Sequence, residues 1–252
     1  RSGDALRHAN LAGTPGISAA LVLAGDDHAC KSSSIPHHSD FSLLNAGLPI
    51  LQPGTPQEIL DYGLYAIALV TNVCDGGASV DVSLDRHHFE TPGEFRKVSS
   101  GMLVPTVANS LEPEAYIRRM DAVRSFRERN PVDRLHGAGA REGRLGIAAA
   151  GKVYYDLRQA LRDLGFDDAA LHAMGIRIAQ YAMTYSVSEP FTRAFAEGLE
   201  TVLVLEEKRS FLELQIKDAL FNAPGRPLVE GKCDQRGEPL TPLTGELDPD
   251  LI

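Results

Sequence analysis

The chain has 252 residues, of which 43% are hydrophobic and 23% are charged, so it can bury a sizeable core and is not disordered throughout. Its 25 basic and 34 acidic residues give a net charge of −9, which argues against a general nucleic-acid-binding protein. No apolar run is long enough for a membrane span. Three scattered cysteines without a Cys-x-x-Cys pair predict ordinary thiols in a reducing cytoplasm, and neither a disulfide scaffold nor a cluster or zinc site.

The start of the sequence resembles the middle of a protein. It begins with Arg1 rather than methionine, and no basic start leads into an apolar segment as in a signal peptide. We therefore expect the chain to be an internal piece of a longer polypeptide.

Three segments of the first hundred residues have the pattern of strands. Residues 17–24, ISAALVLA, are a short apolar run closed by Gly25, which is typical of a buried parallel strand. Residues 49–52 predict a second strand, and the alternation over 78–84 predicts a third.

A helix is expected between the last two of these strands. Thr55 and Glu58 form a capping box around Pro56 at the first helical position, and the predicted helix runs to about Val70. Its apolar side would hold Ile59, Leu60, Leu64, Ile67 and Ala68.

The second half of the chain repeats strand and helix. Residues 112–129 have a helical composition, and residues 130–143 predict an exposed loop or linker. From Arg144 onward the alternation predicts a parallel sheet with helices on both faces. We expect strands near 145–149, 176–183, 201–206 and 227–230, and helices in YYDLRQALRDLG (closed by Gly165), EPFTRAFAEGL and RSFLELQIKDALFN.

The polar loop after the first strand is the main candidate site. Residues 25–34, GDDHACKSSS, carry two carboxylates, an imidazole, an ammonium and three hydroxyls just beyond a predicted strand, where open α/β sheets bind ligands. Lys31 could pair with an anionic carboxylate, and His28 could move protons. The alternative is a solvated loop with Asp and Ser as turn residues.

The remaining histidines give weaker signals. His37 and His38 are adjacent, but a metal site needs three converging ligands, so we expect no metal and favour a substrate-contacting histidine in this segment. His87 and His88 are expected at the surface.

Nucleotide and hydrolase motifs are missing. Gly151 and Lys152 resemble a phosphate turn at a helix start, but the spacing of a Walker A loop, GxGxxG and GxSxG do not occur. The charge run at 206–209, EEKR, predicts a solvated face or a set of ion pairs between domains.

Eight motifs in collinear order resemble one known family. They are RSGDALRHANLAGT, GDDHACKSS, HSD, PQEILDYGL, ASVDV, RLGIAAAGKVYYDLRQAL, EGLETVLVLEEKR and GELDPDLI. The chain resembles the large fused indolepyruvate ferredoxin oxidoreductases of the thiamine-diphosphate-dependent 2-oxoacid:ferredoxin oxidoreductase superfamily. The resemblance covers nearly the whole chain and is weakest from about Gly93 to Arg144.

This resemblance implies an α/β fold. The remainder of a thiamine pyrimidine-binding-type domain would be followed by a transketolase C-terminal-like domain with a mainly parallel sheet. The implied boundaries are 1–100 for the first domain, 101–143 for a linker or helical connection, 144–235 for the second domain and 236–252 for a tail.

The implied reaction is oxidative decarboxylation of an aryl-pyruvate, with coenzyme A as acceptor and ferredoxin as the electron acceptor. The implied cofactors are thiamine diphosphate with magnesium, whose diphosphate site lies outside this chain, and iron–sulfur clusters elsewhere in the full protein. The implied partners are the rest of the polypeptide, ferredoxin, the 2-oxoacid, coenzyme A and a second copy of the chain in a homo-oligomer. No nucleic acid or membrane is expected, the location is cytoplasmic, and this segment alone is expected to be inactive.

The resemblance also suggests site residues. Asp26, His28, Lys31, Ser32 and Ser33 match positions that the family places near cofactor and substrate. His37 matches a family histidine and would, with His28, relay protons, whereas Lys31 would bind the 2-oxoacid carboxylate. His38 stands where the family usually has glutamine. The activating glutamate of the family would lie upstream of Arg1, so none is assigned here.

Several segments depart from the family pattern. Residues 71–77 and 180–186 differ from the usual runs, and the region around Gly137 is atypical. These departures leave two interpretations beside the active enzyme for an aryl-pyruvate: a different 2-oxoacid, or a diverged inactive homologue or structural assembly fragment with the same fold.

Overall fold

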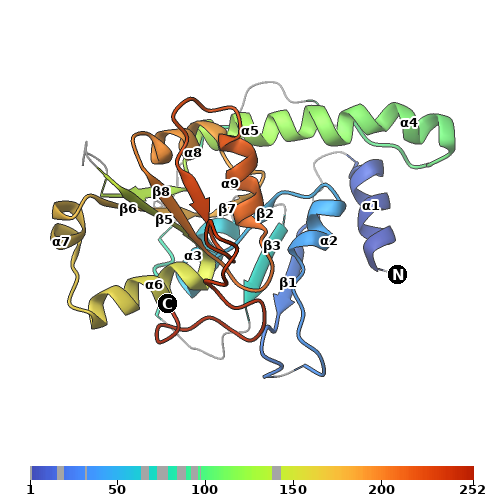
Figure 1. Cartoon of the computed structure of the whole chain (residues 1–252). Coiled ribbons are helices and arrows are strands. Elements are labelled where there is room, and N and C mark those ends of the chain that lie inside the picture. The colour runs from blue at the N-terminus through green and yellow to red at the C-terminus, as the bar shows by residue number, and fades with distance from the viewer. Residues whose placement is uncertain are drawn as a thin grey trace.

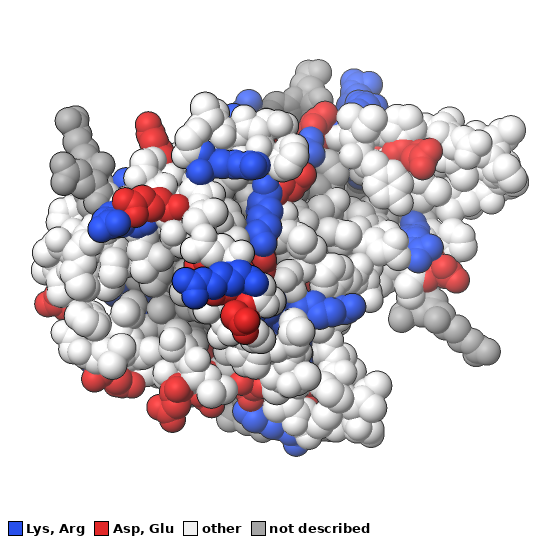
Figure 2. Space-filling view, in the orientation of Figure 1, with Lys and Arg blue, Asp and Glu red and all other residues white. Residues whose placement is uncertain are grey.

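The computed structural model of the chain describes residues 2–15, 20–31, 33–63, 68–72, 79–83, 89–91, 96, 98–137 and 143–252. Two β-sheets form the centre of the molecule, and helices pack against them (Figure 1). No helix in these ranges is long and apolar enough to cross a membrane. Figure 2 shows acidic and basic side chains intermingled over one face of the molecule.

The first sheet combines strands from both halves of the chain. Its order is β1-β3-β2-β7. The strands are β1 (Val22–Asp26), β3 (Ala68–Asn72), β2 (Ile50–Leu51) and β7 (Met183–Tyr185). β3 pairs parallel with β1 and β2, whereas β7 pairs antiparallel with β2. The second half of the chain therefore supplies one edge of the first sheet.

Short helices accompany this sheet. They are α1 (Ser2–Ala12), α2 (Asp40–Asn45) and α3 (Pro56–Gly63). Leu43 of α2 and Ile50 of β2 pack against Phe211 from the second half of the chain. Apolar burial thus joins the two halves, in addition to the strand pairing.

The second sheet has five strands in the order β4-β6-β5-β8-β9. They are β4 (Arg134–His136), β6 (Ile176–Tyr181), β5 (Leu145–Ala150), β8 (Thr201–Leu205) and β9 (Leu228–Glu230). All neighbours are parallel except β4, which pairs antiparallel with β6 at one edge. Four parallel strands rich in Ala, Val, Ile and Leu are what burial on both faces requires.

Helices cover both faces of this sheet (Figure 1). α6 (Gly151–Asp163) and α7 (Asp168–Ala173) share a core with Ile147 and Ile178, together with Leu247 from near the C-terminus. α8 (Glu189–Ala196) and α9 (Leu212–Leu220) pack on the other face around Val202 and Val204. The result is a three-layer α/β/α unit.

A buried carboxylate links α3 to the second sheet. Glu58 accepts hydrogen bonds from Tyr155 Oη at 2.7 Å, Gln180 Nε2 at 2.8 Å and the Gly54 backbone N–H at 2.8 Å. A Cβ on Gly54 would lie 2.4 Å from the Gly151 carbonyl oxygen, so this close approach requires glycine. The packing of the two halves is therefore specific at this point.

One long helical segment extends along the outside of the molecule (Figure 1). It consists of α4 (Pro105–Pro113), a π-helical turn (Glu114–Arg118) and α5 (Arg119–Arg129). The helix expected over 112–129 is thus confirmed, and it starts earlier than predicted.

The structure confirms the strand and helix alternation predicted after Arg144. The four expected strands correspond to β5, β6, β8 and β9, and the three expected helices to α6, α8 and α9. Gly165 has φ +82° just after α6, as the glycine at the end of a helix should. The helices α1, α2 and α7 were not expected. The division at residues 100, 143 and 235 stays a prediction.

The helix predicted from Thr55 to Val70 is wrong in its second part. α3 ends at Gly63, and Ala68–Asn72 form β3, paired with β1 over its whole length. Pairing within the sheet overrides the local helical pattern. The expected apolar side is also wrong for Ile59 and Leu60, which are exposed, while Glu58, Asp61 and Tyr62 of the same helix are buried.

Three smaller differences concern strands. The first strand begins at Val22, without residues 20 and 21, and continues to Asp26, whereas residues 17–19 lie outside the described residues. Residues 79–83 form no strand, and the rest of the predicted strand 78–84 lies outside the described residues. The predicted loop 130–143 contains β4, because its alternating residues complete the edge of the second sheet. Cys74, His87 and His88 lie outside the described residues.

Candidate functional site

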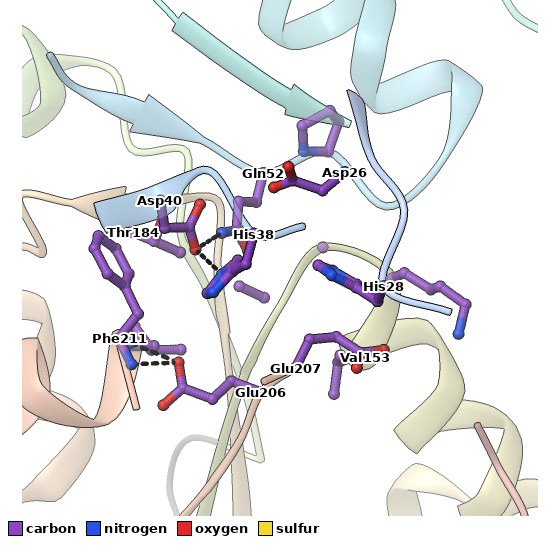
Figure 3. A pocket seen from close by; sticks show the side chains of 15 residues that line it. Asp26, His28, His38, Asp40, Gln52, Val153, Thr184, Glu206, Glu207 and Phe211 are labelled. Atoms are coloured by element: carbon purple, nitrogen blue, oxygen red, sulfur yellow. Dashed lines mark hydrogen bonds and ion pairs between the residues drawn. The ribbon is translucent and has the colours of Figure 1, made fainter. Parts of the chain in front are cut away.

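A pocket lies where strands of both sheets end. Asp26 is the last residue of β1, Gly151 follows β5, and Glu206 follows β8. Ligands of open α/β sheets bind beyond this carboxyl edge. The pocket (Figure 3) is lined by Asp26, His28, His38, Asp40, Gln52, Pro53, Ala150, Gly151, Lys152, Val153, Thr184, Glu206, Glu207, Phe211 and Leu212.

Two adjacent aspartates shape the loop on one side of the pocket. Asp27 accepts from the backbone N–H of Lys31 at 2.9 Å and of Ser33 at 2.8 Å. Asp26 accepts from Ser39, from its N–H at 2.9 Å and from its hydroxyl at 2.6 Å. The described residues between Asp27 and Ser39 form no helix or strand, and these hydrogen bonds to the two carboxylates hold the loop in place.

His28 is buried at the pocket and has a defined tautomer. Its Nδ1 lies 3.1 Å from the carbonyl oxygen of His37. A carbonyl can only accept, so Nδ1 carries the proton and Nε2 is the basic atom of the neutral ring. Burial, followed by the nearby His38, lowers the pKa of His28, although the His37 carbonyl and Asp26 oppose this. The ring is suited to accept a proton.

A second histidine lies beside it. The rings of His28 and His38 are 5.6 Å apart in an edge-on arrangement. His38 Nε2 is 2.8 Å from Asp40 Oδ2, which also accepts from Gln52 Nε2 at 2.8 Å (Figure 3). Burial alone would lower the pKa of His38, but its hydrogen bond to Asp40 and the negative charges around it raise it above 6.5.

Two glutamates border the pocket from the second sheet. Glu206 accepts from the backbone N–H groups of Phe211, Leu212 and Glu213 at the start of α9. Burial raises the pKa of Glu206 to about 7, although these hydrogen bonds oppose the shift. Glu207 accepts from the Leu247 N–H at 2.9 Å and 3.0 Å.

The other members of the charge run at 206–209 also have partners. Lys208 donates to the carbonyl of His28, and the Arg209 guanidinium lies 4.7 Å from the centre of the Phe41 ring. Glu206 and Glu207 accept backbone hydrogen bonds and Lys208 donates to the loop of the first sheet, so the alternative of a solvated face is wrong for 206–208, whereas Arg209 is exposed.

A charge network closes the side of the pocket near the C-terminal segment. Lys152 Nζ bonds Asp156 at 2.6 Å and the Leu247 carbonyl at 2.9 Å, and lies 3.5 Å from Glu246. Glu246 also pairs with Lys31 at 2.5 Å. The lysine of the apparent phosphate turn is thus neutralised by carboxylates of the chain itself.

Comparison with known families identifies the second half of the chain. Residues 135–252 match the family model described as the indolepyruvate oxidoreductase domain. This domain supplies Gly151, Lys152, Thr184, Glu206 and Glu207 to the pocket.

Curated relatives extend the similarity over most of the chain. The chain is 27% identical over 228 residues to the indolepyruvate oxidoreductase subunit IorA of Methanothermobacter marburgensis. This alignment covers 85% of the chain and 35% of the relative. It is 24% identical over 229 residues to the IorA subunit of Thermococcus kodakarensis, covering 84% and 34%. The chain thus spans about a third of the length of these relatives. The resemblance stated from the sequence motifs is confirmed.

A solved structure shows the same fold. The 2-oxoglutarate:ferredoxin oxidoreductase from Magnetococcus marinus aligns with a TM-score of 0.56 and 12% sequence identity, over 98% of this chain and 48% of that chain. The predicted fold class, α/β with a mainly parallel sheet, is confirmed.

The loop residues proposed from the sequence do not all lie at the pocket. Asp26 and His28 line the pocket opposite the indolepyruvate oxidoreductase domain. Lys31 and His37 are exposed, and only the backbone carbonyl of His37 contacts His28. The Ser33 hydroxyl donates to the Ile35 carbonyl. Ser32 lies outside the described residues.

Sequence reasoning missed much of the pocket lining. His38 and Asp40 received little weight, and Gln52, Thr184 and Glu206 were not candidates. Two signals could have found three of them: Gln52 and Glu206 are polar residues at the ends of predicted strands, and Asp40 is a carboxylate two residues from a histidine. Thr184 lies in β7, whose pairing with β2 nothing in the local sequence indicates.

Proposed function

We propose that this chain forms one wall of the active site of a 2-oxoacid:ferredoxin oxidoreductase. The substrate would be an aryl-pyruvate such as indolepyruvate, oxidatively decarboxylated with coenzyme A and ferredoxin. The main support is the pocket at the carboxyl ends of both sheets, where a neutral, oriented imidazole, that of His28, faces the indolepyruvate oxidoreductase domain.

The pocket residues fit part of the implied cofactor. When bound, thiamine diphosphate supplies a carbon nucleophile and an electron sink for decarboxylation. Asp40 Oδ1 and Thr184 Oγ1 are buried at the pocket without a hydrogen-bond partner among the described residues, and they suit the amino group and ring nitrogens of an aminopyrimidine. No three His, Cys, Asp or Glu side chains of the described residues come together as a metal site, so we assign none of them to magnesium.

The chain's own residues would then act on the substrate from one side. Phe211, Leu212 and Val153 give the pocket apolar walls that exclude water. His28 Nε2 would accept a proton, since its lowered pKa keeps the ring neutral near pH 7. The iron–sulfur clusters, ferredoxin, a second copy of the chain and the remaining groups of the active site would contact this wall from outside. The complete enzyme would be cytoplasmic.

The role of Lys31 is proposed separately. Its ammonium pairs with Glu246 at 2.5 Å and would have to leave this partner to bind a 2-oxoacid carboxylate. We expect Lys31→Ala in the full-length protein to raise KM for the 2-oxoacid by about 10-fold with little change in kcat, because it removes a contact made equally in the ground state and the transition state.

Glu246→Gln is the matched control for that measurement. It releases the same ion pair but keeps the ammonium, so KM should not rise. Equal increases of KM in both variants would instead mean that Lys31 only holds its loop against the C-terminal segment.

The decisive experiment uses the full-length protein and the 252-residue chain side by side. With thiamine diphosphate, magnesium, coenzyme A and a low-potential dye, the full-length protein should reduce the dye when indolepyruvate or another aryl-pyruvate is added. The isolated chain should not, because the groups for the diphosphate and for electron transfer are proposed to lie outside it. Absence of dye reduction by the full-length protein with every aryl- and alkyl-2-oxoacid tried would favour a non-catalytic homologue.

A further inference from the structure

The pocket contains a carboxylate–imidazole pair that is almost fully buried. The side chains of His38 and Asp40 are 11% and 3% exposed, and His38 Nε2 lies 2.8 Å from Asp40 Oδ2. Gln52 donates to the same carboxylate oxygen at 2.8 Å and fixes the orientation of the carboxylate. Because Asp40 can only accept when ionised, Nε2 of His38 is the protonated nitrogen.

The other ring nitrogen of His38 has no hydrogen-bond partner in the described part of the chain. His38 Nδ1, Asp40 Oδ1 and Thr184 Oγ1 are all buried without a hydrogen bond among the described residues, and all three residues line the same pocket. A buried polar atom without a hydrogen bond is destabilising, so three around one pocket indicate that a polar ligand completes it.

We propose that His38 and Asp40 are an acid–base dyad in which Asp40 positions the imidazole and His38 exchanges a proton with an oxygen of the bound 2-oxoacid. This role rests on the proposed function. Asp40 is a positioning residue: it fixes the tautomer and stabilises the imidazolium, while Nδ1 is left for the ligand.

The proton balance of this role is closed. When a nucleophile adds to the keto carbon, the electron pair of the C=O π bond moves to oxygen, and His38 Nδ1–H gives that oxygen its proton. The ring becomes neutral and keeps Nε2–H on Asp40. When the carbonyl forms again, the hydroxyl proton returns to Nδ1 and the imidazolium is restored.

The charges around His38 support its protonated form. Asp26 at the end of β1, Asp40 at the start of α2 and Glu206 after β8 all favour the imidazolium, and together they outweigh its burial. His28, on the neighbouring loop, is positioned edge-on and has a lowered pKa. Paired groups with pKa values shifted apart are the arrangement that acid–base chemistry uses.

One cation also borders the pocket. Lys152 of α6 lines it, but its ammonium is bonded to Asp156 and lies 3.5 Å from Glu246. The field at His38 is therefore dominated by carboxylates. This leaves His38 as the proton donor of the pocket and His28 as the acceptor.

The protonation states can be measured without any turnover. Hydrogen–deuterium exchange at the imidazole C2 position, followed by mass spectrometry, gives the pKa of each histidine in the full-length protein. We expect the pKa of His38 above 6.5 and that of His28 below it. Asp40→Asn should lower the pKa of His38, whereas His172→Gln, a change at an exposed histidine of α7, should alter neither. A His38 pKa at or below 6.5, or one that Asp40→Asn leaves unchanged, overturns the dyad.

Kinetics test the role itself. In the wild type, kcat/KM for the 2-oxoacid should fall as the pH rises through the pKa of His38, because the donor is lost. Asp40→Asn should move this alkaline limb to lower pH. His38→Gln, which keeps an N–H donor but cannot titrate, should abolish the limb and lower kcat by about 10²-fold.

The outcomes separate the two proposals. A wild-type enzyme that turns over a 2-oxoacid while His38→Gln keeps both its rate and its alkaline limb overturns the dyad and leaves the proposed function standing. A full-length protein that turns over no 2-oxoacid overturns the proposed function, and the role of His38 with it. Circular dichroism and thermal unfolding of each variant confirm that the fold is retained.

Discussion

Arg127→Ala is expected to destabilise the protein by about 3–5 kcal/mol, the usual cost of leaving one member of a buried ion pair without its partner. The side chains of Arg127 and Asp133 are 6% and 4% exposed. Arg127 also donates to the carbonyls of Met183 and Ser186, and Asp133 accepts from the N–H of Ala182 at 2.8 Å. Removing the guanidinium takes a donor away from both carbonyls and leaves Asp133 Oδ2 without its ion-pair partner.

Unfolding in urea or by heat measures the loss, and Arg124→Ala is the control. Arg124 lies on the same helix, is 57% exposed and pairs with Asp121, so its removal should change stability by less than about 0.5 kcal/mol. Hydrogen exchange of the amides of β7 should accelerate in Arg127→Ala only. Equal stability of the two variants would show that the buried pair does not hold β7 in place.

His28→Ala is expected to lower kcat of the full-length enzyme by about 10²–10⁴-fold, the range for a lost general acid or base. KM should change little, because proton transfer contributes in the transition state rather than in the bound ground state. Because the pKa of His28 is lowered, protonation of this ring should reduce wild-type activity on the acid side, below pH 6.5.

Steady-state kinetics of His28→Ala, with His172→Gln as the exposed control, decide this prediction. The acid limb of the pH profile should disappear in His28→Ala and persist in the control. Wild-type kcat and an unchanged acid limb in His28→Ala would return residues 25–34 to the interpretation of a solvated loop.

Local signals in the sequence sufficed for the four parallel strands of the second sheet. The apolar runs of β5, β6 and β8, each followed by an amphipathic helix, specify parallel strands buried on both faces. Gly165 marked a helix end because a positive φ is needed there. These elements follow from a few neighbouring residues, so the sequence pattern was enough.

The first sheet and most of the site depend on contacts distant in the sequence. The sequence of β3 was predicted as the end of a helix, because the strands that pair with it, β1 and β2, lie elsewhere in the chain. Asp26 and His28 could be predicted, since polar residues after a strand indicate a site. Glu206 was assigned to a run of solvated or interdomain ion-paired residues, because its hydrogen bonds with the start of α9 form only in the folded chain.

The antiparallel pairing of β2 with β7 has a consequence for synthesis of the chain. Leu51 pairs with Met183, so the edge of the first sheet stays open until the ribosome has made the second half. At about 5–20 residues per second, that wait is roughly 7–26 s, during which an unpaired apolar edge is exposed. Until β7 has been synthesised, chaperones or neighbouring segments of the nascent chain must cover this edge.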